Sequence, residues 1–101
     1  DDLDLSSKRV ALFGLGDQLG YPDTFADALA FVADKVRDRG ASVVGAWPAD
    51  GYHFQASWAC TGGSFVGLVL DEHNQADLTP LRLRRWLAQV MQEFDPATAT
   101  A

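Results

Sequence analysis

The chain has 101 residues, 48% of them aliphatic or aromatic, and a formal net charge of −6. This length allows one small domain, and the apolar content argues against disorder throughout. The acidity argues against nucleic acid and anionic membranes and for a basic partner or a cationic ligand. One cysteine, Cys60, excludes an internal disulfide. Because no apolar run approaches the ~20 residues of a membrane span and the acidic start is unlike a signal peptide, we expect a cytoplasmic protein.

The first predicted elements are a strand, a glycine loop and a helix start. Residues 1–7 are polar and acidic and indicate a connecting segment. Val10–Phe13 is an unbroken apolar run, typical of a strand covered on both faces. Pro22–Thr24 carries helix-start signals. Three glycines lie between the two, Gly14, Gly16 and Gly20. The loop therefore follows the carboxyl end of a strand, which is where open α/β sheets bind ligands.

The glycine loop does not fit the dinucleotide fingerprint G-x-G-x-x-G. Leu19 stands where the third glycine would fall, and Asp17 would repel a pyrophosphate. The residues instead indicate a loop that meets a neutral ring edge through backbone N–H groups, with Tyr21 as an aromatic lid. The open alternative is an ordinary tight loop with a surface tyrosine.

The middle of the chain predicts a helix and a split strand. An apolar stripe runs through residues 24–39, and Gly40 is a natural stop. Ser42–Trp47 is the next strand candidate, ended by Pro48. Residues 48–64 are long for a plain connection, so we expect short strands or a hairpin inside them. Phe65–Leu70 then resumes as an apolar strand.

A polar loop and a second helix complete the chain. The loop DEHNQAD, residues 71–77, follows a strand, and Thr79 is the expected N-cap before Pro80 at the first helical position. Core packing is the preferred role for the helical stripe, in which Leu83, Trp86, Leu87, Val90, Met91 and Phe94 lie. Arg82, Arg84 and Arg85 are expected to face away and pair with acids. Residues 95–101 form a short tail.

Other chemistry finds little support in the sequence. Cys60, His53 and His73 share no metal-ligand spacing, and Cys60 is interpreted as a small buried or half-buried residue. Asp71 and Glu72 suggest a cation site, but a solvated acidic loop is the preferred interpretation because the remaining oxygen ligands are missing. We expect no metal site, no catalytic residue and no enzyme activity.

Four blocks of sequence resemble the long-chain flavodoxins. They are FGLGDQLGYPDTFADAL, RGASVVGAWPADGYHFQAS, FVGLVLDEHNQADLT and RWLAQVMQEF, and the resemblance covers the chain from about Lys8 to Phe94. The resemblance implies the C-terminal part of a flavodoxin-like doubly wound parallel α/β sheet, from just before the fourth strand. The inserted loop at residues 48–64 would split the last strand, and the Ser/Thr-rich phosphate loop of the N-terminal half would be absent. In the family's order 2-1-3-4-5, the strand at Val10–Phe13 would have one open edge.

The resemblance implies a low-potential, single-electron carrier that binds FMN and docks on a basic redox partner such as a flavodoxin reductase. Tyr21 would stack on the isoalloxazine ring, and Leu15, Gly16 and Asp17 would meet its pyrimidine edge. The cofactor-binding residues it implies are Leu15, Gly16, Asp17, Gly20, Tyr21, Thr24 and His73. Asp17, Asp71 and Glu72 would place negative charge near the ring. His73 departs from the family's LDEDNQ, in which position 73 is aspartate, and so exchanges a negative charge for a titratable group.

A second hypothesis is that the chain is an apo fragment or an interaction module. The phosphate loop and the second aromatic wall would lie outside it, so FMN binding would be weak. The open strand edge would then favour self-association of the isolated fragment.

Overall fold

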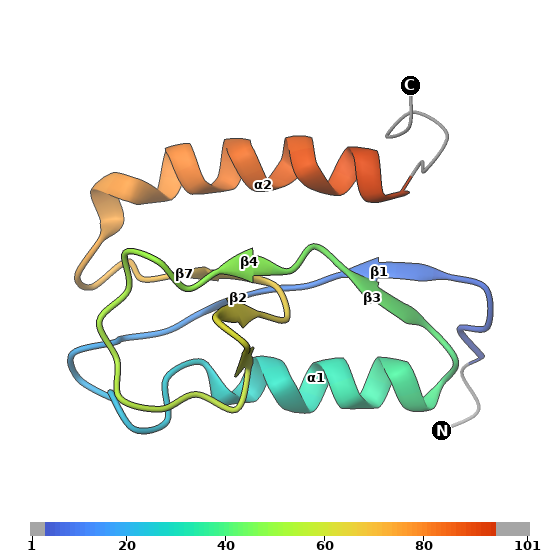
Figure 1. The fold of residues 1–101 in the computed structure, drawn as a ribbon, viewed down its shortest axis with the longest axis horizontal. Coiled ribbons are helices and arrows are strands. Elements are labelled where there is room, and N and C mark those ends of the chain that lie inside the picture. Colours follow the sequence, from blue (N-terminus) through green and yellow to red (C-terminus); the bar gives the residue numbers. More distant parts are fainter. Residues whose placement is uncertain (1–3, 95–101) are drawn as a thin grey trace.

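The computed structural model describes residues 4–94 as three layers, with strands between two helices. Figure 1 shows α1 (Asp27–Asp38) on one side of the strands and α2 (Thr79–Phe94) on the other. This is the α/β arrangement that the sequence predicts. Neither helix is long and apolar enough to cross a bilayer, within the residues that the structure describes.

The predicted first strand is two short strands that change partner. β1 (Arg9–Ala11) pairs in parallel with β3 (Ser42–Val44), and β2 (Phe13–Leu15) pairs in parallel with β7 (Leu68–Leu70). The carbonyl of Leu12, between β1 and β2, accepts the N–H of Leu68 at 3.0 Å. A Cβ on Gly67 would collide with this carbonyl oxygen, so only glycine fits where β7 joins the strand. The change of partner from β3 to β7 explains why the strand is interrupted at Leu12.

The inserted stretch folds as a small antiparallel sheet, which confirms the expected hairpin. β4 (Trp47–Pro48), β6 (Ser64–Phe65) and β5 (Cys60–Thr61) lie in that order. Gly62 and Gly63 have φ of 60° and 85°, so they suit a two-residue type I′ turn between β5 and β6. The strand predicted over Ser42–Trp47 ends at Val44, and Trp47 belongs to this second sheet.

Helix α1 begins later than predicted and ends where predicted. Thr24 accepts the N–H of Asp27 through its carbonyl, and Ala26 has a left-handed φ of 57°, so residues 24–26 form turns before the helix. Gly40 has φ of 98° and donates to the carbonyl of Arg37 at 2.9 Å. Ala41 donates to Val36 at 3.1 Å. These bonds make a Schellman motif, which confirms Gly40 as the stop.

Helix α2 occupies the predicted range, but Thr79 does not cap it. The 3₁₀ turn η1 (Ala76–Leu78) runs directly into the helix, so Thr79 already has helical angles, with φ of −57° and ψ of −47°. Its hydroxyl oxygen is buried and has no hydrogen-bond partner among the described residues. A residue inside the helix cannot accept from the following N–H groups as an N-cap does, so the predicted capping role is wrong.

The core lies on both faces of β7, which is buried along its whole length. Leu68 and Leu70 pack with Trp86 and Val90 of α2. Val69 points to the other face, where the second cluster also contains Phe25, Leu29, Tyr52, Ala59 and Phe65. The alternation of side chains along a strand thus divides the core between the two helices.

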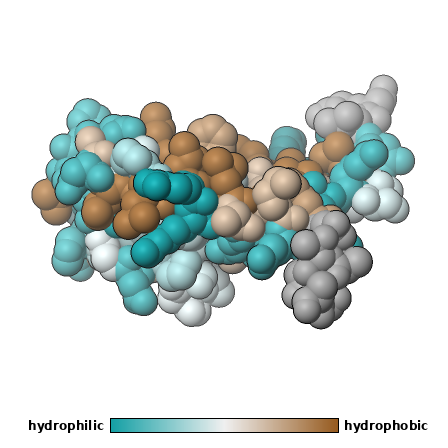
Figure 2. Space-filling model, turned by 90° about the horizontal axis from the view of Figure 1, so that it is seen from above, coloured by the Kyte–Doolittle hydropathy of each residue, from teal (hydrophilic) through white to brown (hydrophobic). Residues whose placement is uncertain are grey.

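One apolar face stays uncovered within residues 4–94. Val10–Phe13 was expected to be covered on both faces, but Phe13 is 62% exposed and β1 and β2 each have one strand partner in the described chain. On α2, Met91 is 69% exposed, so its predicted core role is wrong, whereas that of Trp86 is confirmed. Exposed apolar side chains continue along the same side of α2 at Leu83, Leu87 and Phe94. Figure 2, which looks onto the α2 side, shows apolar surface gathered across the middle of the molecule.

Candidate ligand site at the carboxyl ends of the parallel strands

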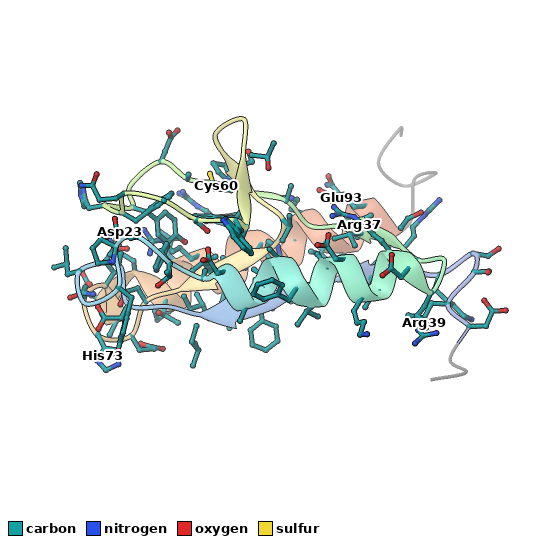
Figure 3. The ribbon with its side chains drawn as sticks, turned by 90° about the horizontal axis from the view of Figure 1, so that it is seen from below. Asp23, Arg37, Arg39, Cys60, His73 and Glu93 are labelled. Carbon is teal, nitrogen blue, oxygen red and sulfur yellow. The ribbon has the colours of Figure 1, made fainter. Side chains whose placement is uncertain are left out.

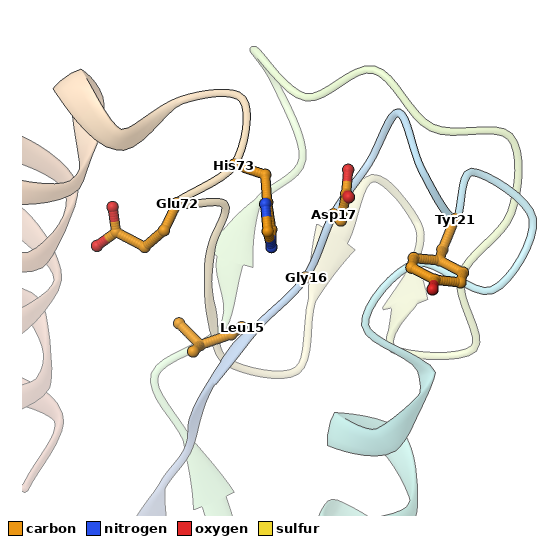
Figure 4. A pocket seen from close by; sticks show the side chains of 6 residues that line it. All are labelled: Leu15, Gly16, Asp17, Tyr21, Glu72 and His73. Atoms are coloured by element: carbon orange, nitrogen blue, oxygen red, sulfur yellow. The ribbon is translucent and has the colours of Figure 1, made fainter.

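The loops after β2 and β7 meet at one end of the molecule and enclose a pocket of about 300 Å³. Its lining residues are Leu15, Gly16, Asp17, Tyr21, Glu72 and His73. Figure 4 shows Tyr21 and His73 on opposite sides of the backbone at Gly16. Because β2 and β7 run parallel, their carboxyl ends deliver both loops to the same edge. The sequence predicted this placement.

The glycine loop is held in shape by Asp17. Its Oδ1 accepts from the backbone N–H of Gly20 at 2.8 Å and from Nδ2 of Asn74 at 2.8 Å. Its carbonyl accepts the N–H of Tyr21 at 2.9 Å. Gly16 lies so close to the ring of Phe25 that a Cβ would overlap it, so glycine is required there. The loop is therefore a hydrogen-bonded turn from which the Tyr21 side chain projects, with 67% of it exposed.

The carboxylate of Asp71 ties this loop to the next one. Asp71 is fully buried, so the predicted solvated acidic loop is wrong at this residue. Its Oδ2 accepts from the backbone N–H and Nε2 of Gln18 at 3.0 and 2.7 Å. Its Oδ1 accepts from the N–H groups of His73 and Asn74 at 3.1 and 3.0 Å, and Asn74 Nδ2 donates to both oxygens. A buried carboxylate with this many donors is a structural anchor rather than a surface charge.

The network continues through Gln18 and Gln75 to Arg82. Gln18 Nε2 donates to Oε1 of Gln75 at 2.8 Å, and its own Oε1 accepts the backbone N–H of His53. Arg82 Nη1 donates to the same Gln75 oxygen at 2.7 Å, and its guanidinium carbon lies 3.9 Å from the ring centre of Tyr52. Arg82 was expected to face away and pair with an acid, but it is buried on an aromatic ring and an amide.

Hydrogen bonding keeps both loop carboxylates ionised. Burial opposes ionisation of Asp71, but the bonds from Asn74 and Gln18 outweigh burial and hold the pKa of this carboxyl below its ordinary value. The bonds from Gly20 and Asn74 likewise lower the pKa of Asp17, and the charge of His73 acts in the same direction. The pocket wall therefore carries a fixed negative charge at Asp17.

The structure brings most of the predicted site residues together. Leu15, Gly16, Asp17, Tyr21 and His73 line the pocket. Thr24 lines an adjacent hollow that shares Leu15, Gly16, Asp17 and Tyr21 with the first. Gly20 lines neither hollow and serves the loop turn instead. The role of each in binding stays a prediction.

Two kinds of residue escaped the sequence analysis. Glu72 lines the pocket although it was predicted only as a nearby charge. Gln18, Asn74 and Gln75 form the buried network, and no periodicity or spacing marks them. The available signal was a polar loop residue, Gln18, between two glycine turns, and such residues are common on surfaces.

Thiol and metal chemistry gain no support from the structure. In the part of the chain that is described, no group of three or more His, Cys, Asp or Glu side chains is placed to hold a metal ion. Figure 3 places Cys60 on the hairpin side, well away from His73. Cys60 is half-buried against the aromatic core, as predicted.

The fold and the pocket together define an α/β domain with a partly apolar pocket at the carboxyl edge of its parallel strands. Comparison with known proteins gives the family. Residues 1–86 match the flavodoxin family, to which the chain belongs.

Several flavodoxins are similar to the chain in sequence and fold. It is 51% identical over 94 residues to the flavodoxin of Nostoc sp. and 52% identical over 90 residues to that of Klebsiella pneumoniae. These alignments cover 93% and 89% of this chain but 55% and 51% of the relatives. The structure of Fusobacterium nucleatum flavodoxin bound to flavin mononucleotide matches with a TM-score of 0.86 and 38% identity, over 91% of this chain and 55% of that one. The chain thus has a flavodoxin-like fold and spans about half the length of these relatives.

Replacing Asp71 with asparagine should destabilise the fold by roughly 3 kcal/mol, because an amide leaves buried donors of Gln18 and Asn74 without a carboxylate oxygen. The lowered pKa also makes Asp71 stabilising above the unfolded pKa of about 3.9, and this contribution is lost as pH falls through the lower folded value. Urea unfolding between neutral and acidic pH measures both effects.

The control is Glu72→Gln at the exposed neighbouring position, which should change stability by less than about 0.5 kcal/mol. Equal stability of Asp71→Asn and the unchanged protein at neutral pH would contradict the anchoring role.

Proposed function

We propose that the chain is the ring-binding part of an FMN-dependent, single-electron carrier rather than an enzyme. The observation that carries this proposal is the pocket itself, which Tyr21 and Gly16 line at the carboxyl ends of β2 and β7. Membership of the flavodoxin family supports it, as does the fold shared with a flavodoxin bound to flavin mononucleotide.

The residues of the pocket fit a planar heteroaromatic ring. Tyr21 offers an exposed ring face, and Leu15 adds apolar surface beside it. The N–H of Asp17 faces no protein acceptor among the described residues, so it is free to donate to a ring carbonyl. FMN, when bound, would supply the one-electron chemistry, and this chain would hold and orient its ring.

The charge of the pocket suits a low potential. Asp17 is held ionised, and Glu72 lies on the same wall. A reduced flavin gains negative charge, so fixed carboxylates nearby disfavour the reduced form and lower the potential. Asp71 was expected to act in the same way, but its charge is buried and spread over several donors.

Tyr21→Ala should weaken FMN binding by roughly tenfold or more, because aromatic stacking contributes about 0.5–1.5 kcal/mol beyond the area it buries. It should also shift the potential of the reduced couple. The measurement is a fluorescence titration of FMN on a polypeptide long enough to span the full length of the relatives.

Leu19→Ala is the matched control, since Leu19 lies on the same loop and is 66% exposed but lines a different hollow. Tyr21→Phe should retain most of the affinity. If Tyr21→Ala and Leu19→Ala bind FMN equally, Tyr21 does not stack on the ring.

We propose a basic redox partner of the flavodoxin reductase type, because the net charge of −6 steers cationic surfaces toward the protein. Electron-transfer rates with such a reductase should fall steeply as salt rises, since exposed charges are screened within about 8 Å at physiological ionic strength. A rate that stays flat between low and high salt would argue against an electrostatic docking surface. The cytoplasmic location stays a prediction from the sequence.

The uncovered face suggests that these 101 residues bind FMN weakly and self-associate when isolated. Met91 and Leu87 of α2 and Phe13 of β2 expose apolar surface that another strand or chain would cover. In a longer polypeptide, we propose that the remainder of the flavodoxin fold covers it. Sedimentation with an FMN titration tests this proposal.

Met91→Glu should reduce the association without touching the core, because Met91 is 69% exposed. Glu72→Gln, at the ligand pocket, should leave the association unchanged. A stable monomer that binds FMN with a Kd below about 1 μM would show that the chain holds a self-sufficient site.

A further inference from the structure

His73 is the one histidine among the residues that line the pocket. Its backbone N–H is fixed by Oδ1 of Asp71 at 3.1 Å, and its imidazole lines the pocket that Tyr21 closes on the other side. The imidazole makes no hydrogen bond within the described part of the chain. It is therefore held in place by the backbone and left free to interact with a ligand.

The charged side chains that line the pocket together with His73 are acidic. Asp17 comes from the loop after β2, Glu72 precedes His73 on its own loop, and Asp71 lies buried behind them. Tyr21 is the remaining titratable residue of the wall, and the pocket lining contains no lysine or arginine. A histidine generally gains its positive charge between about pH 8 and 5. Protonation of His73 would thus add the one positive charge of a wall that is otherwise negative.

We propose that His73 couples proton uptake to reduction of the bound flavin. This inference rests on the proposed function and concerns how the same site is tuned. Two electrons come, one at a time, from a one-electron donor and reduce FMN fully, while the proton comes from solvent and stays on the imidazole. No bond forms between the two. Each event favours the other, since an imidazolium stabilises the anionic reduced ring and a reduced ring stabilises the imidazolium.

The sign of the effect follows from the charges. Below the titration range the imidazolium offsets the carboxylates of Asp17 and Glu72, so reduced FMN binds more tightly and the potential rises. Above that range the acidic wall acts alone and the potential falls. The competing view is that His73 is an exposed loop residue whose charge solvent screens completely, and it predicts no such dependence.

The experiment compares affinities for oxidised FMN and for dithionite-reduced FMN between pH 5.5 and 8.5, on a polypeptide long enough to span the full length of the relatives. The ratio of reduced to oxidised affinity should rise about tenfold more in the unchanged protein than in His73→Asn as pH falls, which corresponds to about 30 mV for the two-electron reduction by dithionite. Protonation of the flavin itself cancels in this difference because both proteins bind the same cofactor.

His53→Asn is the matched control, because His53 is the second histidine of the chain and lines a different hollow. It should keep the full pH response. His73→Asp should abolish the response and hold the reduced affinity at or below the high-pH value. NMR titration of the His73 ring protons should show a higher midpoint with reduced FMN than with oxidised FMN.

The two levels of failure are distinct. If the unchanged protein does not bind FMN at any pH, the proposed function falls and this inference falls with it. If FMN binds but His73→Asn follows the same pH profile as the unchanged protein, or the His73 midpoint ignores the redox state, the inference is wrong and the proposed function stands.

Discussion

The carboxylate of Asp71 is the interaction on which the site depends. It is fully buried at the end of β7, and donors from the loop after β2 and from its own loop converge on it. Burying a charge costs several kcal/mol unless hydrogen bonds replace water, and here the bonds from Gln18 and Asn74 do so. Because both loops donate hydrogen bonds to the Asp71 carboxylate, neither loop can shift without leaving a buried polar group unpaired.

That constraint explains how flexible-looking loops present a defined surface. The anchor fixes Gln18 on one side and the backbone of His73 on the other, and Asn74 extends it to Asp17, which shapes the glycine turn. Although the side chain of Tyr21 is 67% exposed, its backbone has a defined position because its N–H donates to the carbonyl of Asp17. Pre-organised contacts of this kind lower the ordering cost of binding a planar ligand. The inserted segment joins the same hydrogen-bond network, because the backbone N–H of His53 donates to Oε1 of Gln18.

Features with a local cause were predictable from the sequence. The stop at Gly40 needs a left-handed residue, so a glycine after an apolar helical stripe points to it from the sequence alone. The pocket position followed from strand order and glycine placement. The role of Asp71 was not predictable, because an Asp-Glu pair in a polar loop looks solvated until its partners, 53 residues away in the case of Gln18, are known. The prediction for Arg82 was wrong for the same reason, because Tyr52, a residue distant in sequence, buries its guanidinium. The prediction for Thr79 was wrong because the preceding 3₁₀ turn runs directly into the helix.

The errors in predicted burial carry information of their own. Side chains expected in the core are buried where they pack against β7 or the inserted segment, as at Trp86 and Phe25. They are exposed beside the open edges of β1 and β2, where another strand would have to cover them, as at Met91 and Phe13. The predicted apolar stripe on α2 is therefore present, but the strands of this chain cover only part of it. The two loops of the pocket are held by Asp71 and lie within this chain, whereas the uncovered face consists of exposed apolar side chains. A fold that spans about half the length of its relatives can thus hold the complete geometry of one site wall while its hydrophobic layer remains open.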